Sequence, residues 1–291
     1  PAYNLLPLKL YPYALTFSSR GCPFKCVFCF QNMYGPTFRA NSPKRVVNEM
    51  QLLEKLGFEK IYFQDLEFAI DNKRVFAICE EILKRKLKIK WHCNARFDDM
   101  NDEKMLAKMK EANCILINFG LETASKEVMK ASNKKLSLDK VESVVTILRK
   151  IKLDFATYML LALPGETKKS IRETVRFMVK NNIGMGGGSL PIPYPGTVLF
   201  FKAQQQGLKP TWENIGSLAG KVNTNILHKV GGEKNLYAFV WKTFFEEKYG
   251  KTYYLKPAFW SLGIGKVLSK TVFIAKKGNF RKVKKMLKGK F

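Results

Sequence analysis

The chain has 291 residues, and its 51 Lys and Arg against 24 Asp and Glu give a formal net charge of +27. A hydrophobic content of 46% argues against global disorder, and six cysteines are too few for a disulfide scaffold, which favours a reducing cytoplasm. The longest apolar runs, such as residues 155–163, are far short of the roughly 20 residues that span a membrane. The charge favours an anionic partner, namely nucleic acid, anionic lipid or an acidic substrate, or reflects only a lysine-rich proteome.

Residues 1–13 are predicted to form a linker, because Pro1, Pro7 and Pro12 interrupt short apolar pieces that lack helical spacing. The chain starts at Pro1 rather than at Met, so we expect a further domain to precede this linker in the native protein. Residues 14–18 are predicted to form a buried strand that leads into a cysteine-rich loop.

Three cysteines of this loop, Cys22, Cys26 and Cys29, have the spacing C-x3-C-x2-C. Thiolates this close in sequence can converge on one soft metal centre. A cubane iron–sulfur cluster usually takes four thiolates, so three local ones would leave one iron open to a ligand that is not protein. The alternatives are a tetrahedral zinc site, which favours paired C-x2-C units, and a disulfide cluster, which is typical of short secreted chains.

Buried strands and amphipathic helices then alternate along the chain. Six such alternations predict an α/β fold in which parallel strands with helices outside form a partial (β/α)6 barrel of the TIM type over residues 14–200. Residues 201–291 are predicted to form a strongly basic helical extension. The expected helices cover residues 42–57, 72–86, 101–112, 125–131, 137–150 and 167–181, and the later strands cover 60–65, 87–94, 114–119, 153–163 and 185–191.

Polar residues follow the ends of these strands, where a parallel barrel places its functional loops. Around a metal centre they predict a pocket for a polar ligand, although each carboxylate alone is equally typical of a helix cap or a solvated loop. These residues are Asp65 and Glu67 after the second strand, Asn94 and Arg96 after the third, Glu122 after the fourth, the 163–167 turn after the fifth and residues 191–197 after the sixth.

The cysteine spacing, with Phe28 directly before the last cysteine, resembles the radical S-adenosylmethionine (SAM) superfamily over roughly residues 14–200. The resemblance implies a [4Fe–4S] cluster on Cys22, Cys26 and Cys29, with the open iron bound by the amino and carboxylate groups of SAM. It also implies reductive cleavage of SAM to methionine and a 5′-deoxyadenosyl radical that abstracts hydrogen from a substrate.

The same resemblance implies which residues contact SAM. Asp65 occupies the position that meets the SAM amino group, but relatives usually show two adjacent acids there. This chain has Leu66 in the second place, and whether Glu67 substitutes for it is open. Arg96 corresponds to an arginine near the SAM carboxylate, and Glu122 to an acid that reaches polar groups of SAM.

The adenine of SAM would lie beside two further residues by this resemblance. Phe28 corresponds to the residue that packs near adenine. Gly165 matches the turn after the fifth strand, where a residue without a Cβ lets the backbone approach the base.

Residues 193–197 and 253–257, with Leu6-Pro7 ahead of the loop, resemble radical SAM proteins that carry an N-terminal cobalamin-binding domain. Magnesium-protoporphyrin ester cyclases and hopanoid methylases belong to that group. This kinship implies cobalamin-dependent methyl transfer or oxidative cyclisation of a lipid or tetrapyrrole, and an electron donor such as flavodoxin or ferredoxin. The cobalamin signature D-x-H-x-x-G is absent here, so cobalamin would be held by the missing domain.

Residues 251–291 contain twelve Lys or Arg and no acid, with apolar residues at helical spacing. They fit an interfacial helix on the inner, anionic face of the membrane, a nucleic-acid patch, or a helix docked on the barrel. Two other functions stay open. A tRNA-modifying radical SAM enzyme is favoured by the charge, whereas the strand-end residues argue against a non-catalytic iron–sulfur protein.

Overall fold

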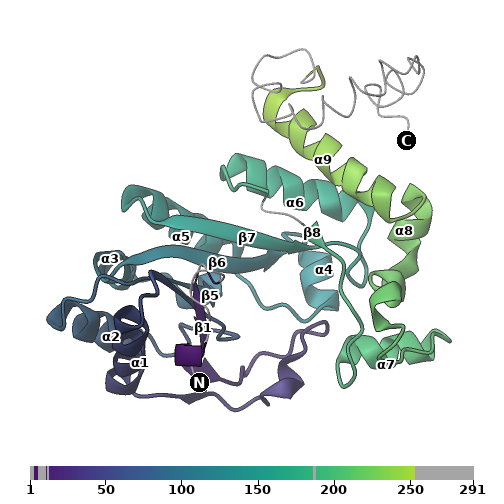
Figure 1. Ribbon diagram of the computed structural model, residues 1–291. Helices are drawn as coiled ribbons and strands as arrows, with labels where there is room; N and C mark the ends of the chain where they lie inside the picture. The colour runs from purple at the N-terminus through teal and green to yellow at the C-terminus, as the bar shows by residue number, and fades with distance from the viewer. Residues whose placement is uncertain (1–2, 6–10, 12, 186–187, 253–291) are drawn as a thin grey trace, which may run out of the picture.

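A computed structural model describes residues 3–5, 11, 13–185 and 188–252. Six strands form one sheet in which every neighbouring pair is parallel and the spatial order follows the order along the chain (Figure 1). This arrangement confirms the predicted α/β barrel-type fold. The strands are β1 (Ala14–Thr16), β4 (Lys60–Phe63), β5 (Lys90–Ala95), β6 (Cys114–Glu122), β7 (Asp154–Leu160) and β8 (Gly188–Ser189).

Amphipathic helices connect the strands and cover one face of the sheet (Figure 1). The first of them begins as predicted, because Ser42 caps it through the amide of Arg45 and Pro43 opens its first turn. Similar caps at Asp71, Asp102, Ser137 and Thr167 begin later helices. The helices are α1 (Pro43–Lys55), α2 (Asn72–Lys84), α3 (Glu103–Glu111), α4 (Lys126–Ala131), α5 (Leu138–Lys150) and α6 (Lys168–Lys180).

The core lies between the sheet and these helices. Trp91 of β5 is fully buried, and its indole N–H donates a 2.7 Å hydrogen bond to the carbonyl of Ala112. The rings of Phe63 and Phe68 pack against it at 5.8 and 5.4 Å between centroids. Alternate residues of each strand therefore point outward into this core, which leaves the other face of the sheet for polar groups.

Two short strands, β2 (Ser19–Arg20) and β3 (Arg39–Ala40), pair antiparallel at the carboxyl end of β1 and bracket the cysteine loop, which also contains the 3-10 helix η3 (Gln31–Met33). Near the start of the chain, the 3-10 helix η1 (Tyr3–Leu5) lies within the predicted linker. Tyr3 is buried, and its hydroxyl donates to Glu49 at 2.8 Å, so this part of residues 1–13 packs on the barrel.

The sixth strand is shorter than the predicted 185–191, since β8 pairs only through Gly188 and Ser189 with the end of β7. The described part of the extension is helical. It contains α7 (Val198–Gln205), η5 (Ile215–Leu218), η6 (Lys221–Asn223), α8 (Thr224–Val230) and α9 (Glu233–Tyr249), and α9 runs beside α6 (Figure 1). Between residues 3 and 252, as far as they are described, no helix has the length and apolarity to cross a membrane. The basic segment predicted to be amphipathic, apart from residues 251 and 252, lies outside the described residues, as do residues 253–257 and Leu6-Pro7.

Candidate functional site

The cysteine loop lies at the carboxyl end of β1 and is tied down on two sides. The amide of Val27 donates a 3.0 Å hydrogen bond to the carbonyl of Ser132, just after α4. The carbonyl of Val27 accepts a 2.9 Å bond from the amide of Leu199, in the first turn of α7. The loop therefore has a fixed course between the barrel and the helical extension.

Gly21 allows the loop to turn directly before its first cysteine. Its φ is +84°, and an added Cβ would lie 1.9 Å from the carbonyl oxygen of Thr37. Both the backbone conformation and the space therefore require glycine, as expected where a loop curls around a bound group.

All three cysteines of the loop are free thiols. Burial raises the pKa of the Cys29 thiol to about 11, and the neighbouring Cys26 and Cys22 raise it further because like charges would repel. Burial also raises the pKa of Cys26, while Lys134 and Arg96 oppose the shift. The three sulfur atoms are close enough to influence one another, and a cationic group bound among them would stabilise their thiolates.

A single metal ion and a cubane cluster need different spacings of their donors, because each thiolate of a cubane binds a different iron. Among the residues whose positions are described, no three His, Cys, Asp or Glu side chains gather closely enough to hold one metal ion.

Asp65 is fully buried, and its carboxylate binds the chain segment that precedes the cysteines. Its carboxylate accepts hydrogen bonds from the amide of Ser18 at 2.7 Å and from the hydroxyls of Ser18 and Ser19 at 2.5 Å each. Arg74 donates to the carbonyl of Ser18 at 2.8 Å. Burial raises the pKa of Asp65, and these bonds oppose the rise. The structure thus gives Asp65 a positioning role.

Glu67 has an oxygen left over. Its Oε1 accepts a 3.0 Å bond from the amide of Ala69, whereas Oε2 is buried and has no partner among the described residues. Burial raises the pKa of Glu67 to about 8. A buried carboxylate oxygen without a partner is costly, so it is expected to meet a donor or cation supplied by a ligand.

Arg96 lies against the cysteine loop. Its guanidinium stands 3.8 Å from the ring centroid of Phe24, within the loop, and it also donates to the carbonyl of Lys135. Its Nε lies 3.6 Å from Asp99 Oδ2, and both atoms are buried without a hydrogen-bond partner in the described structure. The structure therefore places Arg96 against the cysteine loop, paired with Asp99.

Glu122 ends β6 and pairs with a lysine that the strand-end pattern did not reveal. Lys134 Nζ lies 3.8 Å from Glu122 Oε1, and both side chains are largely buried. Burial raises the pKa of Glu122, and Lys134 opposes the rise. A Cβ at Gly120 would lie 2.5 Å from Glu122 Oε1, so glycine makes room for the carboxylate.

Phe28 lies within the cysteine loop, and Gly165 lies in the turn after β7. Phe28 packs against Leu199, Ala203 and Val222 of the extension. Gly165 has φ +80°, which L side chains rarely adopt, although an added Cβ would meet only an ordinary contact at 3.5 Å. Beside it, the buried Glu166 accepts a hydrogen bond from the amide of Ala162 and so holds the turn after β7.

The structure therefore brings the three cysteines together with Glu67, Arg96, Glu122 and the unforeseen Lys134, since each influences the charge of at least one other. Lys134 stands in a run of polar residues after α4, and only its burial distinguishes it from other lysines.

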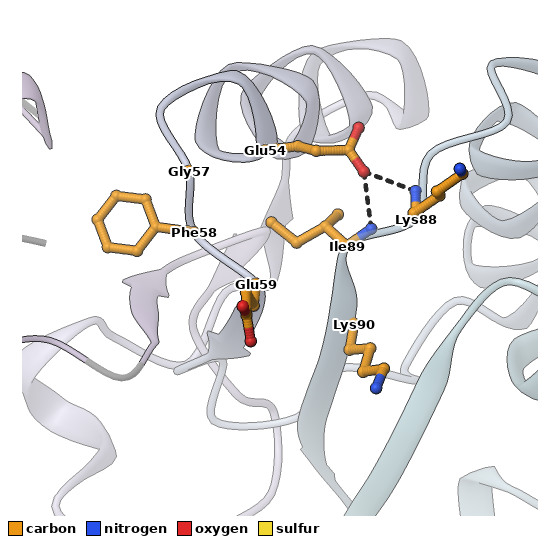
Figure 2. Close-up of a pocket in the computed structure, with 7 residues that line it drawn as sticks. All are labelled: Glu54, Gly57, Phe58, Glu59, Lys88, Ile89 and Lys90. Atoms are coloured by element: carbon orange, nitrogen blue, oxygen red, sulfur yellow. Dashed lines mark hydrogen bonds between the residues drawn. The ribbon is translucent and has the colours of Figure 1, made fainter. Parts of the chain in front are cut away.

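A hollow of about 370 Å³ lies at the other end of the sheet from the cysteine loop, where β4 and β5 begin (Figure 2). Figure 2 shows the Glu54 carboxylate turned toward the amides of Lys88 and Ile89, from which it accepts bonds of 2.6 and 2.9 Å. The functional loops of a parallel barrel lie at the carboxyl ends of its strands, whereas features at the amino ends contribute to stability. This hollow lies at the amino ends and is therefore not the candidate site.

Comparison with known proteins agrees with this geometry. The model of the Radical SAM superfamily matches residues 16–178. An uncharacterized methyltransferase of Pyrococcus horikoshii is 32% identical over 69% of this chain and 45% of its own length. Anaerobic magnesium-protoporphyrin IX monomethyl ester cyclase of Cereibacter sphaeroides is 29% identical over 71% of this chain and 36% of its own length. The chain spans less than half the length of these relatives.

Among solved structures, the radical SAM methyltransferase TsrM of Kitasatospora setae superposes with a TM-score of 0.63 at 19% identity, over 70% of this chain and 41% of that one. Methylornithine synthase superposes with a TM-score of 0.52 at 18% identity, over 81% of this chain and 62% of the other. At these identities the likeness concerns the fold alone.

Proposed function

The chain belongs to the radical SAM superfamily, and from this premise we propose that Cys22, Cys26 and Cys29 hold a [4Fe–4S] cluster used for the reductive cleavage of SAM. A bound cluster would supply the electron for that cleavage. The observation that carries the proposal is the tied-down loop of three free thiols beside buried, unpartnered polar atoms of Glu67 and Arg96.

Two cations near the loop oppose the rise in thiol pKa that burial causes. Lys134 and Arg96 lower the pKa of Cys26 against the effect of burial, and Lys134 does the same for Cys29. Cations beside the thiols reduce the free energy needed to deprotonate them when iron binds. Lys134 is itself held in place by Glu122.

For SAM, we assign the amino group to Glu67 rather than to Asp65. The Asp65 carboxylate already accepts three hydrogen bonds from Ser18 and Ser19, whereas Glu67 Oε2 has no partner in the described structure. An ammonium group there would bring Glu67 into its charged form. Arg96, whose guanidinium lies against the loop and whose Nε is 3.6 Å from Asp99, suits the carboxylate of SAM, and Glu122 its other polar groups.

The adenine of SAM is proposed to lie between Phe28 and the turn at Gly165. The positive φ of Gly165 turns the backbone there, and Phe28 is only partly buried by the helices of the extension. A base in this position would contact backbone groups of the turn, because glycine has no Cβ to keep the ring away from the backbone.

The net reaction is proposed to be methyl transfer or oxidative cyclisation on a lipid or tetrapyrrole. The support is the identity of relatives, which include a magnesium-protoporphyrin ester cyclase, bacteriochlorophyllide methyltransferases and a hopanoid C-2 methylase. Cobalamin, supplied by a further domain, and an electron donor such as flavodoxin or ferredoxin are part of this proposal.

Anaerobic reconstitution tests the proposal directly. The protein should take up about four irons and four sulfides, consistent with one cubane. Adding SAM to the reduced protein should change the spin resonance of the cluster, and incubation should yield 5′-deoxyadenosine or S-adenosylhomocysteine. A protein with a full cluster that shows neither the spectral change nor either product would overturn the proposal.

A further inference from the structure

The two-stranded ribbon of β2 and β3, which brackets the cysteine loop, carries a pair of exposed arginines. Arg20 and Arg39 stand directly opposite each other in its antiparallel register. Residues directly opposite on such a ribbon project from the same face, where two like charges destabilise the pairing. The ribbon has only one other residue pair, Ser19 with Ala40, to offset this repulsion. An anionic group bound beside both arginines would relieve it.

Both guanidinium groups are held in place by neighbouring residues. Arg39 donates hydrogen bonds of 3.1 and 2.7 Å to the carbonyls of Thr37 and Tyr34. Arg20 lies 5.3 Å from the ring centroid of Phe17, and this ring meets that of Tyr34 edge-on at 5.6 Å. The Phe17–Tyr34 pair therefore anchors both arginines, so they cannot easily swing apart.

The positive charge at the loop has no acidic counterpart. Within the described part of the chain, neither arginine forms an ion pair, and nor does Lys25, which is exposed between the first two cysteines. The sequence explains this, because all 24 acidic residues lie between Glu49 and Glu247 and the first 48 residues contain none. The ribbon and the loop therefore present an uncompensated positive surface.

This positive surface is joined directly to the cysteines. The Cys22 amide donates a 3.3 Å hydrogen bond to the carbonyl of Gly35, within the turn whose carbonyls Arg39 binds. The other two cysteines of the loop are only half-buried. A large partner that binds the two arginines would therefore stand close to a group that the cysteines hold.

We propose that the ribbon is the docking surface for an acidic protein that delivers the reducing electron, with Arg20 and Arg39 binding its carboxylates. The inference rests on the proposed function, which needs an electron from outside the chain. Forked guanidinium groups match carboxylates, and an uncompensated positive surface steers an acidic protein toward it. One electron leaves the donor, which is oxidised by one electron, and reduces the cluster on the three cysteines by one; no bond or proton is transferred.

Nucleic acid is the other anionic partner to consider. Proteins bind unpaired nucleotides through phosphate contacts together with aromatic rings that stack on the bases. The rings beside the arginines are only partly exposed, and they already contact each other and the Arg20 guanidinium. An acidic protein surface therefore fits the ribbon better.

Binding of an acidic flavodoxin in its oxidised form tests the docking surface without turnover. The full chain with its reconstituted cluster is titrated by calorimetry at about 0.05 M and about 0.5 M salt. We expect the double variant Arg20→Glu with Arg39→Glu to bind about tenfold more weakly at low salt and to lose most of the salt dependence.

The matched control is the double variant Lys60→Glu with Lys90→Glu. These exposed lysines are also register partners on neighbouring strands, β4 and β5, and the change in net charge is the same. They lie at the amino ends of their strands, away from the cysteine loop. This variant should bind flavodoxin as the wild type does.

Two further measurements separate charge from folding. Since Arg39→Glu also removes hydrogen bonds of the loop, Arg20→Glu is measured alone and should weaken binding about threefold. Stopped-flow reduction then compares two reductants. Reduced flavodoxin should react about tenfold more slowly with the double ribbon variant, whereas reduced methyl viologen, a small cation, should react with it at least as fast as with the wild type.

Unchanged flavodoxin binding in the ribbon variants, an equal loss in the lysine control, or no binding by the wild type would overturn the inference. Loss of tRNA binding with flavodoxin binding intact would assign the ribbon to nucleic acid instead. Iron content and the SAM-dependent spin resonance are recorded on the same samples. Normal spectra with unchanged flavodoxin binding would refute the docking surface alone, whereas a wild type without the spectral change would refute the proposed function.

Discussion

The ammonium of Lys134 lies 3.8 Å from Glu122 Oε1, with both side chains largely removed from solvent. This pair stands directly beside the cysteine loop, since Lys134 also lowers the pKa of Cys26 and Cys29. The ammonium of Lys134 therefore pairs with a carboxylate of the barrel and also lowers the pKa of two thiols of the loop.

Removing that cation should destabilise the protein. We expect Lys134→Met to lower the free energy of unfolding by about 3 kcal/mol, because a buried carboxylate is left without its partner. Urea unfolding at pH 7 measures the change. The exposed neighbour Lys135 gives the control, since Lys135→Met should change the value by less than about 0.5 kcal/mol. Equal effects of the two substitutions would show that the pair contributes nothing.

The cysteines of the loop should differ from buried cysteines elsewhere. Cys26→Ala is expected to lose the iron and sulfide content of a cluster, because a ligand is missing. Cys79→Ala removes an equally small side chain from α2, where the thiol is fully buried. It should keep the cluster and lose only about 1 kcal/mol of stability through the cavity. Iron analysis and thermal unfolding separate the outcomes, and a cluster that survives in Cys26→Ala would contradict the assignment.

Substitutions at Gly21 and Gly35 distinguish the effect of a steric clash from the effect of a strained backbone conformation. Both have positive φ, +84° and +78°, but a Cβ would collide with Thr37 only at Gly21 and would meet nothing within 4 Å at Gly35. Gly35→Ala should therefore cost about 1–2 kcal/mol and still bind iron. Gly21→Ala should cost more and prevent cluster assembly. If both variants take up the same amount of iron, the contact between a Cβ at position 21 and the Thr37 carbonyl does not control cluster assembly.

Substitutions at Asp65 and at Glu67 should have different effects, the first on stability and the second on SAM binding. Asp65→Asn disturbs the bonds to Ser18 and Ser19, so we expect a lower Tm together with weaker cluster loading. Glu67→Gln should keep the Tm but weaken SAM binding roughly tenfold, since a charge-assisted hydrogen bond is lost. Calorimetry with SAM on the reconstituted protein measures the second effect. Unchanged SAM affinity in Glu67→Gln would return the amino group to Asp65.

Glu166 predicts a pH dependence of stability. Burial raises its pKa to about 8 from 4.5, so the folded state holds the proton more tightly than the unfolded state. The stability that this provides is complete below about pH 4.5 and is lost as the pH rises toward 8, with a slope of up to about 1.4 kcal/mol per pH unit. Glu166→Gln should make the wild-type curve of unfolding free energy less steep between pH 5 and 8, and the slope that remains includes that of Glu67, whose pKa burial also raises to about 8.

Glu111→Gln is the control for this titration, because the Glu111 side chain is 59% exposed and joins only a surface ion pair. Its pH profile should follow that of the wild type. A Glu166→Gln profile as steep as the wild-type profile would mean that other groups carry the dependence.

The order of the elements could be predicted from the sequence because helix periodicity and caps are local. Ser42-Pro43 signals its helix without any knowledge of the fold, and the residues after each strand necessarily meet at one end of a parallel sheet. The positions of Glu67, Arg96 and Glu122 near the cysteines follow from this rule.

Partners that lie far apart in sequence could not be predicted in the same way. The hydrogen bonds of Ser18 and Ser19 to the Asp65 carboxylate depend on how β1 and β4 align. The burial of Lys134 depends on how the chain after α4 packs on the loop. Each is a property of tertiary packing, which local patterns do not encode.

Val27 gives the cysteine loop a mechanical role in the molecule. Its amide is held by the turn after α4 and its carbonyl by the first turn of α7, so one peptide segment fastens the C-terminal helices to the barrel. The residue next to Cys26 thus links α7 to the barrel, in addition to the packing of α9 beside α6. A partner that pulls on the extension would thus also act on the loop that carries Cys22, Cys26 and Cys29.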